Sequence, residues 1–136
     1  MLLYGVCISD IKNVKLEGVK DLMKALGIYD TCMEDCDNDD SNILEWVDNY
    51  ETEGRYGLGA LLYDAMTEKE PYNVSIDDPD GLTYIGLSLD LPWKYNNATK
   101  TMQEDEYNAM LSKYIVKVTD ESLDIKIWNI NDEAGY

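Results

Sequence analysis

One segment, residues 72–91, limits the possible folds most strongly because its pattern is typical of a hairpin of two antiparallel strands. The strand-forming sequences YNVSI (72–76) and LTYIGLSLDL (82–91) flank the turn sequence DDPDG (77–81). The second arm alternates, with one face formed by Thr83, Ile85, Leu87, Leu89 and Leu91 and the other by Tyr84, Gly86, Ser88 and Asp90. Such alternation predicts a mostly antiparallel sheet that buries one face against helices.

The remaining elements follow from hydrophobic spacing along the chain. Apolar runs predict two more strands, over residues 2–8 and 123–130. Helical spacing predicts four helices: over 14–26, over 42–50, from Leu58 through the stripe that ends at Met66, and over 102–117, where a strand at 114–118 is the alternative. The stretch before residue 42 is predicted to be a loop, and Asn42 with Glu45 to form a capping box.

We therefore expect an α+β fold for residues 1–136. It would be a small single domain with a mostly antiparallel sheet of about four strands and helices packed on one face.

Charge is distributed unevenly over the chain. The 28 acidic and 11 basic residues give a formal net charge of −17. Residues 1–29 hold three acidic residues and four lysines, whereas residues 30–53, which we name the acidic segment, hold ten acidic residues and no basic one. This charge opposes direct binding to nucleic acid or to an anionic membrane. The expected partner is therefore a basic protein, in particular one that binds nucleic acid; the alternative is that the charge serves only solubility.

Several kinds of chemistry are unfavoured by the composition. The absence of histidine removes the commonest general base and metal ligand. Cys7, Cys32 and Cys36 are too few for a disulfide framework, and a closed zinc site needs four ligands. The sequence also contains no signal-peptide pattern and no apolar run long enough for a membrane span. We expect a cytoplasmic protein that is not an enzyme and needs no cofactor.

Calcium binding through an EF-hand loop is tested by the spacing of the acidic residues. Asp35, Asp37 and Asp39 fit the first, third and fifth loop positions, but Asp40 replaces the glycine and Trp46 replaces the final glutamate. The EF-hand pattern thus fails, and weak binding of divalent cations is left as an alternative.

Aromatic residues accompany the carboxylates of the acidic segment. Tyrosine and tryptophan are preferred anchors of protein interfaces, although Trp46 could instead belong to the core. The predicted partner-binding residues are Asp35, Asp37, Asp39, Asp40, Glu45, Trp46, Asp48, Tyr50, Glu51 and Glu53.

These observations favour an acidic inhibitor or regulator that binds a basic protein. In size and charge the chain is similar to the DNA-mimic proteins that mobile elements such as phages use against host nucleases, which implies an anti-defence role of the anti-CRISPR or anti-restriction type. One alternative is an immunity protein that neutralises a basic toxin. Another is a small divalent-cation-binding protein or enzyme.

Overall fold

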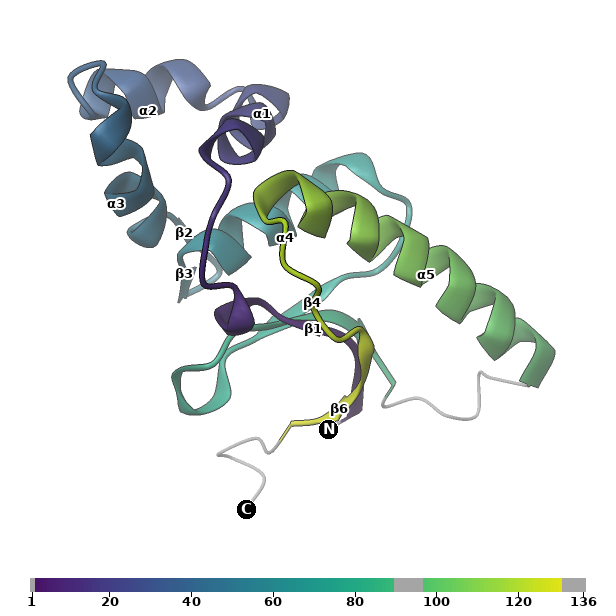
Figure 1. The fold of residues 1–136 in the computed structure, drawn as a ribbon. Helices are drawn as coiled ribbons and strands as arrows, with labels where there is room; N and C mark the ends of the chain where they lie inside the picture. The colour runs from purple at the N-terminus through teal and green to yellow at the C-terminus, as the bar shows by residue number, and fades with distance from the viewer. Residues whose placement is uncertain (1, 90–96, 131–136) are drawn as a thin grey trace.

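A four-stranded antiparallel sheet forms the base of the fold in the computed structural model, which describes residues 2–89 and 97–130 (Figure 1). The strand order is β4-β5-β1-β6. The bounds are Leu2–Cys7 for β1, Ser75–Asp77 for β4, Tyr84–Ser88 for β5 and Lys126–Asn129 for β6. The predicted α+β class is confirmed, as is an antiparallel sheet of four strands.

The register of the sheet explains its apolar face. Tyr4 lies opposite Leu87 and Val6 opposite Ile85, and Ile85 also lies opposite Ile76 on β4. Because directly opposed residues share a face, these side chains together contact the hydrophobic core beneath the helices. The predicted hairpin is therefore confirmed in its pairing and in the face that holds Ile85 and Leu87. Its first strand is Ser75–Asp77 rather than 72–76, so Asp77 lies in the strand and not in the turn. Asp90 and Leu91 lie outside the described residues.

Two long helices cover this face of the sheet (Figure 1). Helix α4 spans Leu58–Lys69 and α5 spans Asn97–Val118. The end of α5 stays helical because Tyr114, Ile115 and Val118 are spaced to enter the core together. The alternative of a strand at 114–118 is therefore wrong, and the helix begins five residues before the predicted start at 102.

Helix α1, Leu16–Leu26, packs against both α4 and α5. Gly18 allows the close approach to α5, since a Cβ at this position would lie 1.5 Å from the carbonyl oxygen of Lys117. Gly27 ends the helix in the left-handed conformation with φ 74°, and its N–H donates to the carbonyl oxygens of Lys24 and Met23. The predicted helix over 14–26 is confirmed.

The acidic segment differs from its prediction in two places. Residues Tyr29–Asp35 form a helix, α2, where a loop was predicted, because Cys32 and Cys36 lie one turn apart and are both buried. Strands β2 (Glu51–Thr52) and β3 (Arg55–Tyr56) form a small hairpin that was not predicted. The predicted short helix is present as α3, Ile43–Asp48. Short 3-10 turns complete the fold at Ile8–Asp10, Asp40–Asn42 and Pro79–Gly81.

Helices α2 and α3 lie farther from the sheet than α4 does, with α1 beside them (Figure 1). Helix α2 packs on α1, and α3 packs on α2 and α4. The acidic segment thus forms an outer part of the molecule that is supported by other helices. Within the described residues, no helix has the length and apolar character needed to cross a membrane.

Candidate protein-interaction site

The acidic segment has an apolar inner face and an acidic outer face. Its inner face consists of Cys32, Cys36, Ile43 and Val47, which are each at most 3% exposed. All ten acidic side chains of the segment are exposed: Asp30, Glu34, Asp35, Asp37, Asp39, Asp40, Glu45, Asp48, Glu51 and Glu53. Burial of the inner face therefore holds ten carboxylates at the surface of folded elements rather than on a loose chain.

Asp39 and Asp40 are exposed, and each also contacts another side chain of the protein. One oxygen of Asp39 accepts hydrogen bonds from the backbone N–H and the hydroxyl of Ser41, at 3.0 and 2.8 Å. The Ser41 hydroxyl, followed by its N–H, lowers the pKa of Asp39. Lys20 on α1 donates to Asp40 at 2.6 Å and so ties the turn before α3 to α1. These two predicted site residues fix the shape of the segment, and Lys20 offsets part of its charge.

Glu51 and Glu53 hold the turn between β2 and β3. The Glu51 carboxylate accepts from the N–H of Gly54 at 2.8 Å. Glu53 and Gly54 both have positive φ, 48° and 80°, as the tightest hairpin turns require. The hydrogen bond between Glu53 and the Tyr63 hydroxyl, with burial as a second cause, raises the pKa of Tyr63 to about 12.

Five carboxylates of the acidic segment have no partner in the part of the chain that the structure describes. Among the described residues, no hydrogen bond or ion pair satisfies the side chains of Asp30, Glu34, Asp37, Glu45 and Asp48. Three of these, Asp37, Glu45 and Asp48, belong to the predicted partner-binding set. Their charge is available to an external cation.

Tyr50 connects the acidic segment to α4 instead of projecting freely. Its half-buried hydroxyl donates to Asp64, whose other oxygen accepts from the hydroxyl of Thr52 at 2.9 Å. Burial and the neighbouring Asp64 raise the pKa of Tyr50 well above its usual range. Asp64 was missed as part of this region, because it lies on α4 outside the acidic segment and no local sequence pattern points to it.

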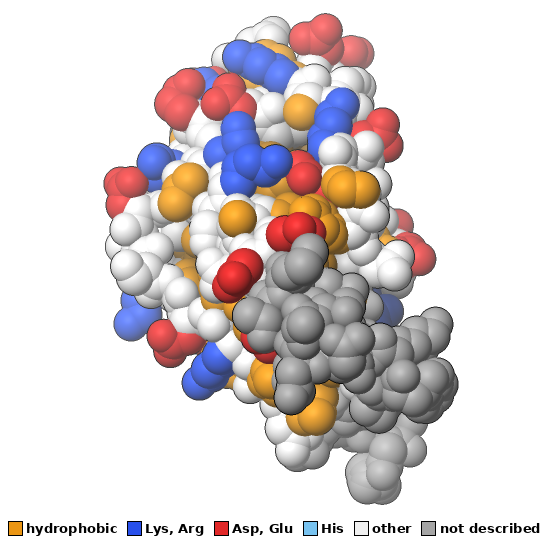
Figure 2. Space-filling model, turned by 90° about the vertical axis from the view of Figure 1, so that its right-hand side faces the viewer, with side chains coloured by type: hydrophobic (Ala, Val, Ile, Leu, Met, Phe, Trp, Pro, Cys, Tyr) orange, Lys and Arg blue, Asp and Glu red, His pale blue; other side chains and the backbone are white. Residues whose placement is uncertain are grey.

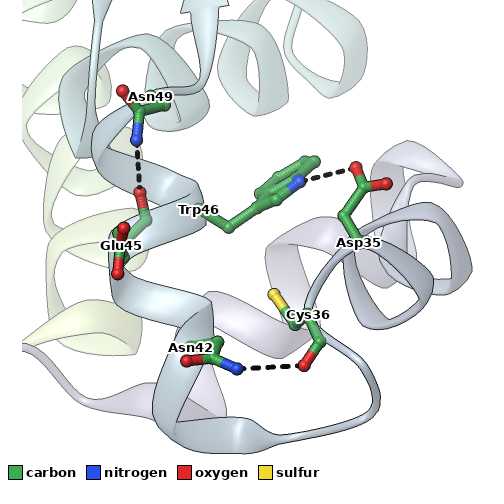
Figure 3. Close-up of a pocket in the computed structure, with 6 residues that line it drawn as sticks. All are labelled: Asp35, Cys36, Asn42, Glu45, Trp46 and Asn49. Atoms are coloured by element: carbon green, nitrogen blue, oxygen red, sulfur yellow. Dashed lines mark hydrogen bonds between the residues drawn. The ribbon is translucent and has the colours of Figure 1, made fainter.

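Trp46 is half-buried, so it lies between the two predicted alternatives of an exposed interface residue and a core residue. Its ring packs against the core and contacts Tyr50, with ring centroids 5.8 Å apart. Its indole N–H donates to Asp35 on α2 at 2.9 Å. The indole thus bridges α3 and α2 beside a hollow of about 290 Å³ (Figure 3), which is lined by Asp35, Cys36, Asn42, Glu45, Trp46 and Asn49.

The helix cap predicted at Asn42 takes a different form. Asn42 precedes α3, but its side chain makes no cap hydrogen bond to the helix. It donates instead to the carbonyl oxygen of Cys36 at 3.1 Å, which joins the start of α3 to the end of α2. This contact shapes one end of the hollow.

The cysteines and carboxylates form no metal centre among the described residues. No group of three or more acidic or cysteine side chains converges there. The sulfur atoms of Cys32 and Cys36 lie 3.9 Å apart in the core, and burial, together with the hydrogen bond to Cys36, raises the pKa of Cys32 to about 12. Cys32 is accordingly a buried thiol at neutral pH.

A different charge pattern is visible on the α5 side of the molecule. Figure 2 shows lysine and acidic side chains interspersed on that face, with apolar side chains between them. The contrast with the acidic segment, which has no basic residue of its own, sets the segment apart as a distinct surface.

The chain matches no protein-family model, no curated protein and no solved structure.

Proposed function

We propose that the protein is an inhibitor or regulator that uses its acidic segment to occupy the basic surface of a nucleic-acid-binding protein. The observation that supports this most directly is the exposure of all ten carboxylates on a supported, folded segment without a basic residue. The proposed role is that of a nucleic-acid mimic from a phage or other mobile element.

The spacing of the unpartnered carboxylates supports mimicry. Glu45 and Asp48 are three residues apart on α3, and Asp30 and Glu34 are four residues apart on α2. Residues at these separations face the same side of a helix, with Cβ atoms about 5–6 Å apart. This separation is close enough to the spacing of phosphates for carboxylates to stand in for a nucleic-acid backbone.

Fixed placement strengthens the case for binding over mere solubility. A disordered acidic tail would lose conformational entropy when it binds, whereas α2 and α3 are already held by their buried faces. Uncompensated charge also steers a basic partner towards the segment and raises the association rate, in a manner that salt weakens.

Capture of partners from the native host tests this proposal. One variant neutralises the five unpartnered carboxylates of the segment: D30N, E34Q, D37N, E45Q and D48N. A matched control neutralises five exposed carboxylates elsewhere and therefore has the same net charge: D10N, D21N, E68Q, D105N and D124N. Both variants are first compared with wild type by circular dichroism and urea unfolding.

The wild type and the control are expected to capture the same basic protein, in a complex that salt weakens and that excludes DNA or RNA. The segment variant is expected to lose this complex. Equal capture by the segment variant would refute the role of the acidic segment. Capture of a basic toxin that binds no nucleic acid would support the immunity-protein alternative instead.

A further inference from the structure

The hollow between α2 and α3, named here the α2–α3 hollow, has the size and lining of a receptor for one side chain. Asn42 and Asn49 flank α3 and Glu45 lies within it, at three- and four-residue intervals, so the three residues share one side of that helix. Trp46 reaches from α3 to Asp35 on α2, as Figure 3 shows. The volume of about 290 Å³ lies at the lower limit of pockets for drug-sized ligands, and it suits a smaller group.

The hydrogen bonds around this hollow leave it rich in acceptors. The single N–H of the Trp46 indole is already donated to one oxygen of Asp35. The amide of Asn49 donates to the carbonyl oxygen of Glu45 at 3.0 Å, and that of Asn42 to the carbonyl oxygen of Cys36. Within the described part of the chain, no donor satisfies the second oxygen of Asp35, the Glu45 carboxylate or the two amide oxygens.

A guanidinium group matches this lining better than other common ligands do. It is planar and positively charged, and it carries five N–H donors and no acceptor. The carboxylates of Asp35 and Glu45 can each accept charge-assisted hydrogen bonds, and the Trp46 ring offers an aromatic face for a cation. An anion would be repelled by the two carboxylates, and no group of three metal-ligating side chains converges among the described residues.

We propose that the α2–α3 hollow binds an arginine side chain of the partner protein, with the guanidinium beside Trp46 and Asp35 and with the Glu45 carboxylate adding negative charge at the α3 side of the hollow. This inference rests on the proposed function, because it assigns one specific contact to the basic partner. It predicts that the protein prefers arginine to lysine, since an ammonium group lacks the planar set of donors that can make paired hydrogen bonds to one carboxylate and lie on an indole at once.

Titration of the protein with single amino-acid amides tests this site without the partner. The probes are N-acetyl-arginine amide, N-acetyl-lysine amide and the neutral analogue N-acetyl-citrulline amide. The chain has three tryptophans, so a nitrogen–proton correlation spectrum contains three indole signals. The Trp46 signal is identified by through-bond assignment and by its loss in W46F.

The arginine probe is expected to move the Trp46 indole signal saturably at millimolar concentration, the lysine probe to bind more weakly and the citrulline probe to have no effect. D35N is expected to weaken arginine binding about tenfold, the scale of one lost charge-assisted hydrogen bond. E45Q, which removes one negative charge from the lining, is expected to weaken it about fivefold. The control is D48N, which removes an exposed charge from α3 outside the lining and should leave binding within about twofold.

Three results would each overturn the assignment: an arginine titration that leaves the Trp46 signal unmoved, an equal response to citrulline, or equal weakening by D48N and E45Q. Failure here is distinguishable from failure of the proposed function. If arginine does not bind but the five-carboxylate variant still loses its partner, the site is wrong and the function stands. If that variant keeps its partner, the proposed function is wrong whatever the titration shows.

Discussion

Replacement of Gly18 by alanine tests how α1 and α5 pack. A Cβ at this position would lie 1.5 Å from the carbonyl oxygen of Lys117 and 2.3 Å from its carbonyl carbon, so the obstacle is backbone that no side-chain rotation can move. Ordinary contact begins at 3.4 Å, and the helices would have to separate by roughly 2 Å. The same crossing holds the hydrogen bond from the Lys15 N–H to the Val118 carbonyl oxygen, at 2.6 Å.

The expected loss combines opposing effects. Overpacking of a tight contact costs about 1–3 kcal/mol, and weakening the Lys15 hydrogen bond costs about 1 kcal/mol. Alanine in place of glycine inside a helix contributes about 1 kcal/mol in the opposite direction. We therefore expect G18A to lower the free energy of unfolding by about 2 kcal/mol, despite its better helix propensity.

Urea unfolding followed by circular dichroism measures this change. The control is A25G at an exposed position of the same helix, which isolates helix propensity and should lose about 1 kcal/mol. If G18A were more stable than wild type by about the same amount, propensity alone would account for the result. The close approach of α1 to α5 would then be wrong.

Three further predictions concern buried or half-buried side chains. D64A should lower the free energy of unfolding by about 2 kcal/mol in urea, because it leaves the hydroxyls of Tyr50 and Thr52 without their shared acceptor. Burial would raise the pKa of Glu70, but hydrogen bonds from two α5 side chains outweigh it and lower that pKa. Wild type should thus have a higher free energy of unfolding than E70Q at neutral pH, and this difference should disappear as the pH falls through the pKa of folded Glu70. Urea unfolding at several pH values measures it. Cys32 is buried and its pKa is raised, so mass spectrometry should detect its labelling by iodoacetamide only after unfolding.

The elements with strong local periodicity were predictable, and the weakly patterned ones were not. The stripe from Leu58 to Met66 and the alternation around Ile85 each specify one buried face, and both were confirmed. Helix α2 was missed because its buried positions are cysteines surrounded by carboxylates, which resemble a solvated loop. Asp30 in its first turn favours the helix dipole, but its last turn has no basic residue, and packing on α1 and α3 stabilises the helix.

The site was predictable in composition but not in its internal contacts. Exposure of the acidic side chains follows from the cost of burying charge, and the sequence alone supports it. The pairing of Asp40 with Lys20 and of Tyr50 with Asp64 depends on which helices become neighbours. Such pairings join residues 14 to 20 positions apart, beyond the reach of helical or strand periodicity. The hollow likewise arises only when α2 and α3 are placed side by side.

The acidic segment combines two properties that act against each other in the free protein. Its unpartnered carboxylates repel one another, which opposes the compact arrangement of α2 and α3. Burial of Cys32, Ile43 and Val47 on the inner face offsets that repulsion. A basic partner would neutralise this repulsion while leaving the inner face unchanged. The repulsion that is lost on binding then adds to the attraction between the two surfaces. Salt screens both interactions, and the same ions that ease the strain in the free segment reduce its affinity for a basic surface.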